Sequence, residues 1–210
     1  MNLGDMRWHL EQRFDDIPDT ANSNRLLNQA ARELSEKFQC IKAAGTIATV
    51  IGTMEYDLPS DLIPKSLRRV IWDKYRLSSA SIDDRDYWEQ VATSGTPERY
   101  YVWGSKIGLL PKPSAVKNLL LWYAKYPVAM IVDTDISELP EVLHMPCVLT
   151  AVYRALSADE DDRRMEVFSE LRSMLQEAEE SLKGEQAESF LVYGGASREI
   201  LMGRLRYPWE

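Results

Sequence analysis

The sequence predicts an α+β fold: a helical bundle made from N- and C-terminal helices, an antiparallel β-rich block inserted between them, and an extended C-terminal arm. Three observations predict it. Apolar residues recur every three or four positions within 22–43, short segments of alternating polarity follow, and the helical spacing returns after Leu139. The expected boundaries are 1–45 and 138–183 for the bundle, 46–137 for the β-rich block and 184–210 for the arm, with 1–183 forming a single structural domain.

The first two helices follow from apolar spacing and from residues that begin or end helices. Leu3 to Phe14 carries one apolar face and is expected to end near Pro18. The stronger helix spans 22–43, with Asn22 or Ser23 as the N-cap and Gly45 just beyond its end.

The β-rich block is predicted from short β-branched and aromatic segments between turn residues. The clearest signal is 98–111, where two apolar runs flank Gly104 and Ser105. Glycine at the first central position is what a two-residue type II′ hairpin turn requires. Further strands are expected at 46–50, 54–58, 67–77 and 118–124, with a short helix at 81–91.

The last two helices begin after Leu139. Pro140 suits a helix N-terminus, because its missing N–H would be unpaired there. Pro146 is expected to kink or restart this helix. A final helix is predicted from the apolar spacing between Met165 and Leu182.

Composition excludes several classes of protein. The 25 Lys and Arg residues against 33 Asp and Glu residues give a formal charge of −8, with a pI near 5.0. A dedicated nucleic-acid binder needs clustered basic residues, so none is expected here. We also expect no signal peptide, no membrane span and no disulfide framework, since the two cysteines are isolated and the apolar runs are short.

Catalytic chemistry is not expected. The chain lacks phosphate-binding glycine motifs, a nucleophile elbow and a zinc-protease motif, and His9 and His144 are its two histidines. Cys147 lies one helical turn after His144, a spacing that occurs often by chance. No cofactor or metal is predicted. The 33 acids leave open a hydrolase built on scattered carboxylates.

Three segments are candidates for contact with partners. Residues 159–188 hold eleven acids and four bases, which favours either a solvated helix face or a wall that repels DNA in a channel. The tail is apolar and aromatic, so it either docks on a partner or folds back on the bundle. The candidate residues are Asp159, Glu160, Asp161, Asp162, Glu166 and Glu170 in the acidic helix; Tyr101, Trp103, Gly104, Ser105 and Lys106 in the hairpin; and Tyr193, Ile200, Leu201, Arg204, Leu205, Arg206, Tyr207, Pro208 and Trp209 in the arm.

Three phrases in this order resemble the head-to-tail adaptor, or connector, proteins of tailed bacteriophages. They are TIATVIGTMEYDLPSDL (46–62), TPERYYVWGSKIGLLPKPSAVKNLLLWYAKYP (96–127) and ELPEVLHMPCVLTAVYRAL (138–156). The resemblance covers about residues 1–183 and rests on structural residues and turns, so it carries no catalytic residue with it.

The resemblance implies a structural virion protein of the neck, made in the host cytoplasm. It implies a ring, commonly of twelve subunits, that lies below the portal, extends the DNA channel without binding DNA specifically, and docks a downstream tail or nozzle protein. The hairpin would contact the tail or a neighbouring subunit, and the arm would dock on the portal. A stopper, a tail-tube protein and a soluble module that binds a host protein remain alternatives.

Overall fold

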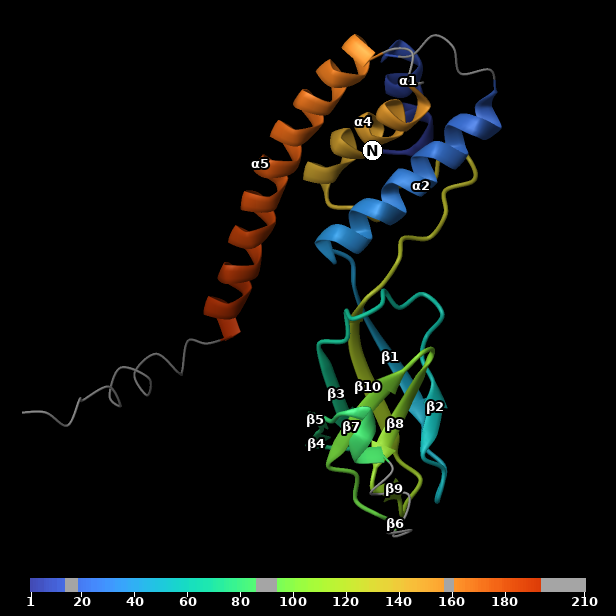
Figure 1. The fold of residues 1–210 in the computed structure, drawn as a ribbon, viewed down its shortest axis with the longest axis vertical. Helices are drawn as coiled ribbons and strands as arrows, with labels where there is room; N and C mark the ends of the chain where they lie inside the picture. The colour runs from blue at the N-terminus through green and yellow to red at the C-terminus, as the bar shows by residue number, and fades with distance from the viewer. Residues whose placement is uncertain (14–18, 86–93, 157–160, 194–210) are drawn as a thin grey trace, which may run out of the picture.

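The helices gather at one end of the molecule and the strands at the other, and a long last helix runs along one side (Figure 1). The computed structural model describes residues 1–13, 19–85, 94–156 and 161–193 of the chain. The helical elements are α1 (Leu3–Arg13), α2 (Thr20–Phe38), the 3₁₀ turn η1 (Glu141–Leu143), α4 (His144–Ala155) and α5 (Asp161–Tyr193). This order confirms the predicted α+β class.

Helix α4 is the centre of the helical part. It contacts α1, α2 and α5, and it is buried along almost its whole length from His144 to Val152. A helix that is apolar on every side is stable only when it is surrounded by other elements. Pro146 lies in the first turn of α4, where its missing N–H breaks no helical hydrogen bond, so it marks a restart after η1 and not a kink.

Helix α2 begins and ends earlier than its apolar spacing predicts. Its N-cap is Asp19, whose carboxylate accepts a hydrogen bond from Ala21 N at 3.0 Å, so the predicted caps Asn22 and Ser23 are wrong. Its C-cap is Gln39 in the left-handed conformation, with φ of 47°. Gly45, expected just beyond the helix, instead lies within the first strand.

Helix α5 is longer than the sequence predicted. It continues from Asp161 to Tyr193, so the first ten residues of the predicted arm are helical. A helix of 33 residues spans roughly 50 Å at 1.5 Å per residue. Its far end therefore reaches the level of the strands (Figure 1).

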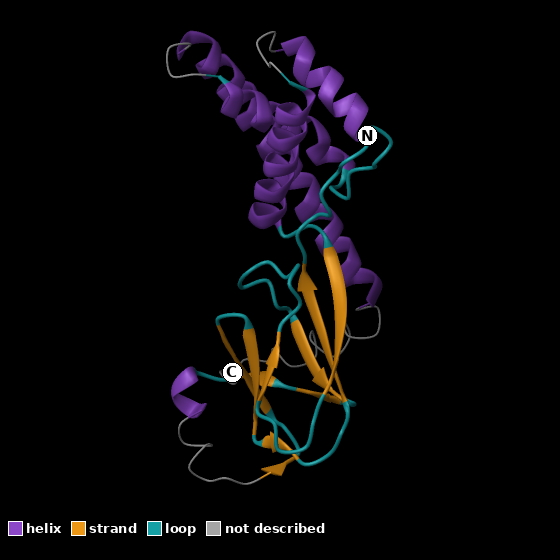
Figure 2. Cartoon of the chain, turned by 90° about the vertical axis from the view of Figure 1, so that its right-hand side faces the viewer, coloured by secondary structure: helices purple, strands orange, loops and turns teal. Residues whose placement is uncertain are grey.

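Within the described ranges, the strands form two four-stranded sheets and one small two-stranded sheet (Figure 2). The first has the order β1-β10-β3-β4 and the second the order β2-β8-β7-β5, while β6 pairs with β9. Pairing is antiparallel except for the short pairs β5–β7 and β6–β9. The strands are β1 (Lys42–Ala48), β2 (Glu55–Asp57), β3 (Arg69–Trp72), β4 (Tyr75–Arg76), β5 (Ser78–Ser79), β6 (Ser94–Gly95), β7 (Arg99–Trp103), β8 (Lys106–Leu110), β9 (Lys112–Pro113) and β10 (Asn118–Ala124).

Three predicted β-block elements need comment. The strand expected at 67–77 is a hairpin, β3–β4, because Asp73 turns the chain with φ of 57°. The first strand starts at Lys42, four residues before its predicted start at 46. Of the predicted helix 81–91, residues 82–85 are helical, and 86–91 lie outside the described residues.

The described residues form two separate hydrophobic cores. One lies among the helices and includes Leu3, Leu27 and Val148. The other lies between the two large sheets, with Val70 and Leu119 from one sheet facing side chains of the other. The chain crosses between the parts where β1 begins and where β10 ends, and there Lys125 N donates to Ile41 O at 2.9 Å. The strand part is thus an insertion between α2 and η1.

Candidate interaction surfaces

The tip of the β7–β8 hairpin exposes an aromatic side chain. Gly104 takes a φ of 60°, as the predicted turn requires, and Trp103 beside it is 63% exposed. Lys106 is paired across the hairpin with Trp103, and its Nζ lies 3.9 Å from Glu55 Oε2. Trp103, Gly104, Ser105 and Lys106 therefore remain available for contact with another protein.

Tyr101 has a different role from the one predicted for it. It is 1% exposed and its hydroxyl donates to Glu55 Oε1 at 2.8 Å, so in this subunit it belongs to the interior and not to a contact surface. Its ring lies over Gly108, its partner on β8, where an added methyl group would overlap the ring atoms. Tyr101 and Trp103 lie two residues apart and therefore on the same face of β7, so strand alternation could not show that one is buried and the other, beside the turn, is exposed.

The predicted acidic helix is only partly free to face a channel. Glu170 pairs with Arg13 of α1 at 2.7 Å, whereas Glu166 is exposed. Asp161 and Asp162 are the first residues of α5, and Asp159 and Glu160 lie outside the described residues. The helical period places Glu177 and Glu180, both exposed, on the same side of α5 as Glu166. The sequence prediction did not include these two.

The predicted portal-docking arm lies mostly outside the described residues. Tyr193 is the last residue of α5. The other candidates, from Ile200 to Trp209, lie within 194–210, which the structure does not describe.

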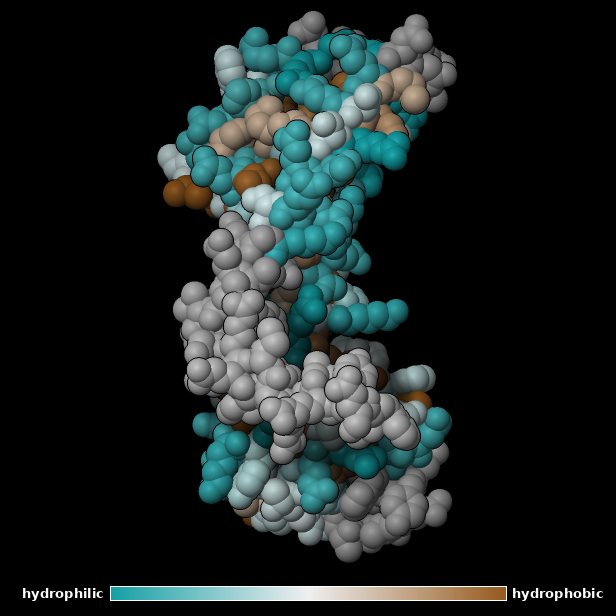
Figure 3. All heavy atoms as spheres, turned by 90° about the vertical axis from the view of Figure 1, so that its left-hand side faces the viewer, coloured by the Kyte–Doolittle hydropathy of each residue, from teal (hydrophilic) through white to brown (hydrophobic). Residues whose placement is uncertain are grey.

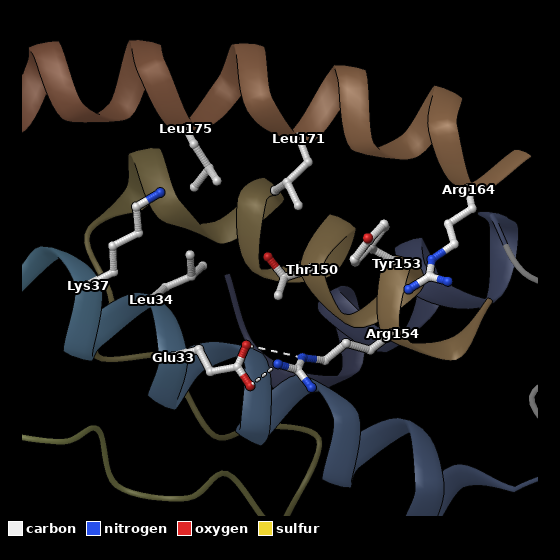
Figure 4. Close-up of a pocket in the computed structure, with 9 residues that line it drawn as sticks. All are labelled: Glu33, Leu34, Lys37, Thr150, Tyr153, Arg154, Arg164, Leu171 and Leu175. Atoms are coloured by element: carbon white, nitrogen blue, oxygen red, sulfur yellow. Dashed lines mark hydrogen bonds and ion pairs between the residues drawn. The ribbon is translucent and has the colours of Figure 1, made fainter. Parts of the chain in front are cut away.

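A groove between α2, α4 and α5 is a surface that the sequence did not predict. It encloses about 530 Å³, and Leu34, Leu171, Leu175 and Tyr153 form its apolar lining (Figure 4). Arg154 forms a two-point ion pair with Glu33, at 2.5 and 3.1 Å, across one side. We call it the α2–α5 groove.

The α2–α5 groove is basic at its edges, although the whole chain is acidic. The groove and its continuation along α5 are lined by two acidic residues, Glu33 and Glu179, and by four basic ones: Lys37, Arg154, Arg164 and Arg172. The Arg164 guanidinium lies 4.7 Å from the Tyr153 ring centroid, and its Nε has no hydrogen-bond partner among the described residues. On the α5 side of the molecule, apolar side chains interrupt a mainly hydrophilic surface over the helices (Figure 3).

The 126–137 loop, which connects the strands back to the helices, exposes an apolar cluster. Ile131 is 77% exposed and Ile136 is 75% exposed, with Val128 and Val132 also outside. The backbone beneath them is held firmly. Asn28 donates to Met130 O and accepts from Met130 N, both at 2.8 Å.

Two further contacts fix the same loop. Asp135 accepts hydrogen bonds from Ile131 N and Val132 N, which lower the pKa of its carboxyl. Asp133 pairs with Arg7 at 2.7 Å, and this contact lowers the pKa of Asp133 in the same way. The exposed aliphatic side chains therefore project from a backbone that hydrogen bonds and an ion pair hold in place.

Two titratable groups of α4, Cys147 and His144, are buried, and burial shifts the pKa of each. Burial raises the pKa of the Cys147 thiol to about 12, and its Sγ points to Leu27 O at 3.5 Å. Burial also lowers the pKa of His144, whose Nε2 contacts Leu139 O at 3.0 Å. A reactive cysteine needs a lowered pKa, so this pair is not an activated nucleophile. Within the described residues no cluster of His, Cys, Asp and Glu could hold a metal ion.

Comparison with protein families agrees with this architecture. The family model described as SU10 adaptor protein matches residues 1–193, which include both the helical part and the inserted strands. The chain belongs to this family. SU10 adaptor proteins are phage head-to-tail adaptors, so the chain is a structural protein of the phage neck, as the resemblance implied. No curated protein matches the chain. In the described part of this adaptor, no helix is long and apolar enough to span a membrane.

Proposed function

We propose that this adaptor assembles as a ring below the portal, extends the DNA channel and docks the next tail component. The observation that carries the proposal is the family match across residues 1–193, because it covers the complete two-part fold. The resemblance implies twelve subunits per ring. The ring lies at the head-tail junction of the virion, and its subunits are made in the host cytoplasm.

The two ends of the subunit have different tasks in this proposal. The hairpin tip at Trp103 and Lys106 contacts the tail side or a neighbouring subunit, which the 63% exposure of the Trp103 ring supports. Exposed aromatic side chains are typical anchors of protein interfaces. The arm, residues 194–210, docks on the portal.

The acidic side of α5 contributes to the channel wall. Glu166, Glu177 and Glu180 are exposed on one side of this helix. A wall of like charge repels the phosphates of DNA, so the duplex passes through without specific binding. The net charge of −8 supports this arrangement.

Light scattering tests the proposal. The solution mass is measured for the protein alone and after mixing with the portal of the same phage. We expect a complex that contains one portal and many adaptor copies, and deletion of 194–210 should abolish it while circular dichroism still shows a folded subunit. A monomer that ignores the portal would contradict the adaptor role and favour a stopper, a tail-tube protein or a soluble module. Loss of folding on deletion would place the tail in the core.

A further inference from the structure

We propose that the 126–137 loop of one subunit inserts into the α2–α5 groove of the next copy of this chain. The inference rests on the proposed function, because it assigns the two faces by which the adaptor would form its ring. Two surfaces of the chain support it because they are complementary: the 126–137 loop, which forms a ridge, and the α2–α5 groove, which is a hollow.

The apolar parts of the two surfaces correspond. The loop presents Ile131 and Ile136, each at least three-quarters exposed, on a backbone fixed by Asn28 and Asp135. The groove offers an apolar lining of Leu171 and Leu175, together with half-exposed Phe168 beside it. A rigid ridge loses little conformational entropy when it binds, which favours affinity.

The charges of the two surfaces are also complementary. The loop carries Asp133 and Asp135 and no base. Asp135 has no cationic partner among the described residues, and Asp133 is 62% exposed although it pairs with Arg7. The groove is edged by two acids, Glu33 and Glu179, and by four bases, Lys37, Arg154, Arg164 and Arg172. Opposed patches of this kind select the partner and its orientation.

The positions of the surfaces suit a ring. In Figure 1 α5 lies along the left of the helical part, and the chain between β10 and η1 passes along its right side. A contact between two different faces is heterologous, and it closes into a ring when the rotation between neighbours permits. A subunit cannot place this loop in its own groove, so the occupant is a second copy.

The chain's own tail is a poorer occupant. Residues 194–210 carry Arg198, Arg204 and Arg206 against Glu199 and Glu210, a net charge of +1 that a basic groove would not attract. The acidic 126–137 loop avoids that repulsion. The cross-linking experiment below also detects the tail in the groove.

Chemical cross-linking of the full-length chain tests the contact. In a Cys40→Ser background, the double variant Ile131→Cys/Arg172→Cys is treated with a short bismaleimide after assembly, with or without the portal. We expect a ladder of covalent multimers, and no ladder from either single variant. The matched control, Ile51→Cys/Arg172→Cys, uses an equally aliphatic residue that is 58% exposed in the turn after β1 and should give no ladder.

A second variant measures the contribution of the ridge. Ile131→Glu should raise the apparent dissociation constant for assembly at least about tenfold, whereas Ile51→Glu leaves it unchanged. A single Ile131→Cys variant that forms dimers would overturn the proposal in favour of a loop–loop contact. An intrachain product from Ile200→Cys/Arg172→Cys would overturn it in favour of the tail.

Portal binding separates this inference from the proposed function. If many copies join the portal by light scattering but the double variant gives no ladder, the interface is wrong and the adaptor role stands. If no multi-copy complex forms, both are wrong.

Discussion

At the scale of single residues, the fold depends on one glycine that no turn requires. Gly108 lies in the middle of β8, and it is the absence of a side chain that lets the Tyr101 ring lie across the strand. The Tyr101 hydroxyl then reaches Glu55 on β2, which joins the outer strand of this sheet to its centre. A glycine inside a strand often marks such a close approach.

Gly108→Ala is expected to destabilise the strand part by about 1–3 kcal/mol, because the methyl group would displace a packed ring. Urea unfolding followed by tyrosine and tryptophan fluorescence measures the change. In a Tyr101→Leu background the same substitution should cost much less, and an equal cost in both backgrounds would show that the ring is not the reason.

At the scale of elements, the sequence predicted the type and order of most helices and strands, and it was weaker at their ends. Helix α1, the β7–β8 hairpin and β10 were predicted close to their observed bounds because apolar period and turn chemistry agree there. The hairpin β3–β4 was missed because its turn at Asp73 has neither glycine nor proline. The length of α5 was missed because the apolar spacing fades after Leu182.

The contact surfaces were harder to predict than the elements. Trp103 could be chosen because it lies beside a glycine turn, but Tyr101 has the same residue chemistry and is buried. The α2–α5 groove draws its lining from residues more than 130 positions apart, so no local pattern reveals it. The exposure of Ile131 and Ile136 is likewise set by tertiary contacts with Asn28 and Arg7.

The Asn28 side chain links helix α2 to the 126–137 loop by two hydrogen bonds. Asn28→Ala removes both hydrogen bonds to Met130 and should lower the free energy of unfolding by about 1–3 kcal/mol. Amide hydrogen exchange of 128–136 should become faster at the same time. The control is Gln29→Ala, which changes the exposed neighbouring residue. If Gln29→Ala speeds exchange of 128–136 equally, the hydrogen bonds of Asn28 are not what holds the loop.

At the scale of the whole molecule, the two cores predict two unfolding steps. The helical and strand cores share no residues, and the chain crosses between them twice. Calorimetry should resolve two transitions, with Leu27→Ala shifting one and Leu119→Ala shifting the other, since both side chains are fully buried. A single transition that both variants shift would instead support the single structural domain predicted from the sequence.

The place where the strands are inserted has a consequence for how the protein can change. Lys42 and Ala124 are paired across β1 and β10, so the two ends of the insertion lie only one strand spacing apart, roughly 5 Å. Any other small β module whose ends meet at that separation satisfies the same two connections. The strand part can accordingly be exchanged during evolution or by design while the helical core keeps its sequence.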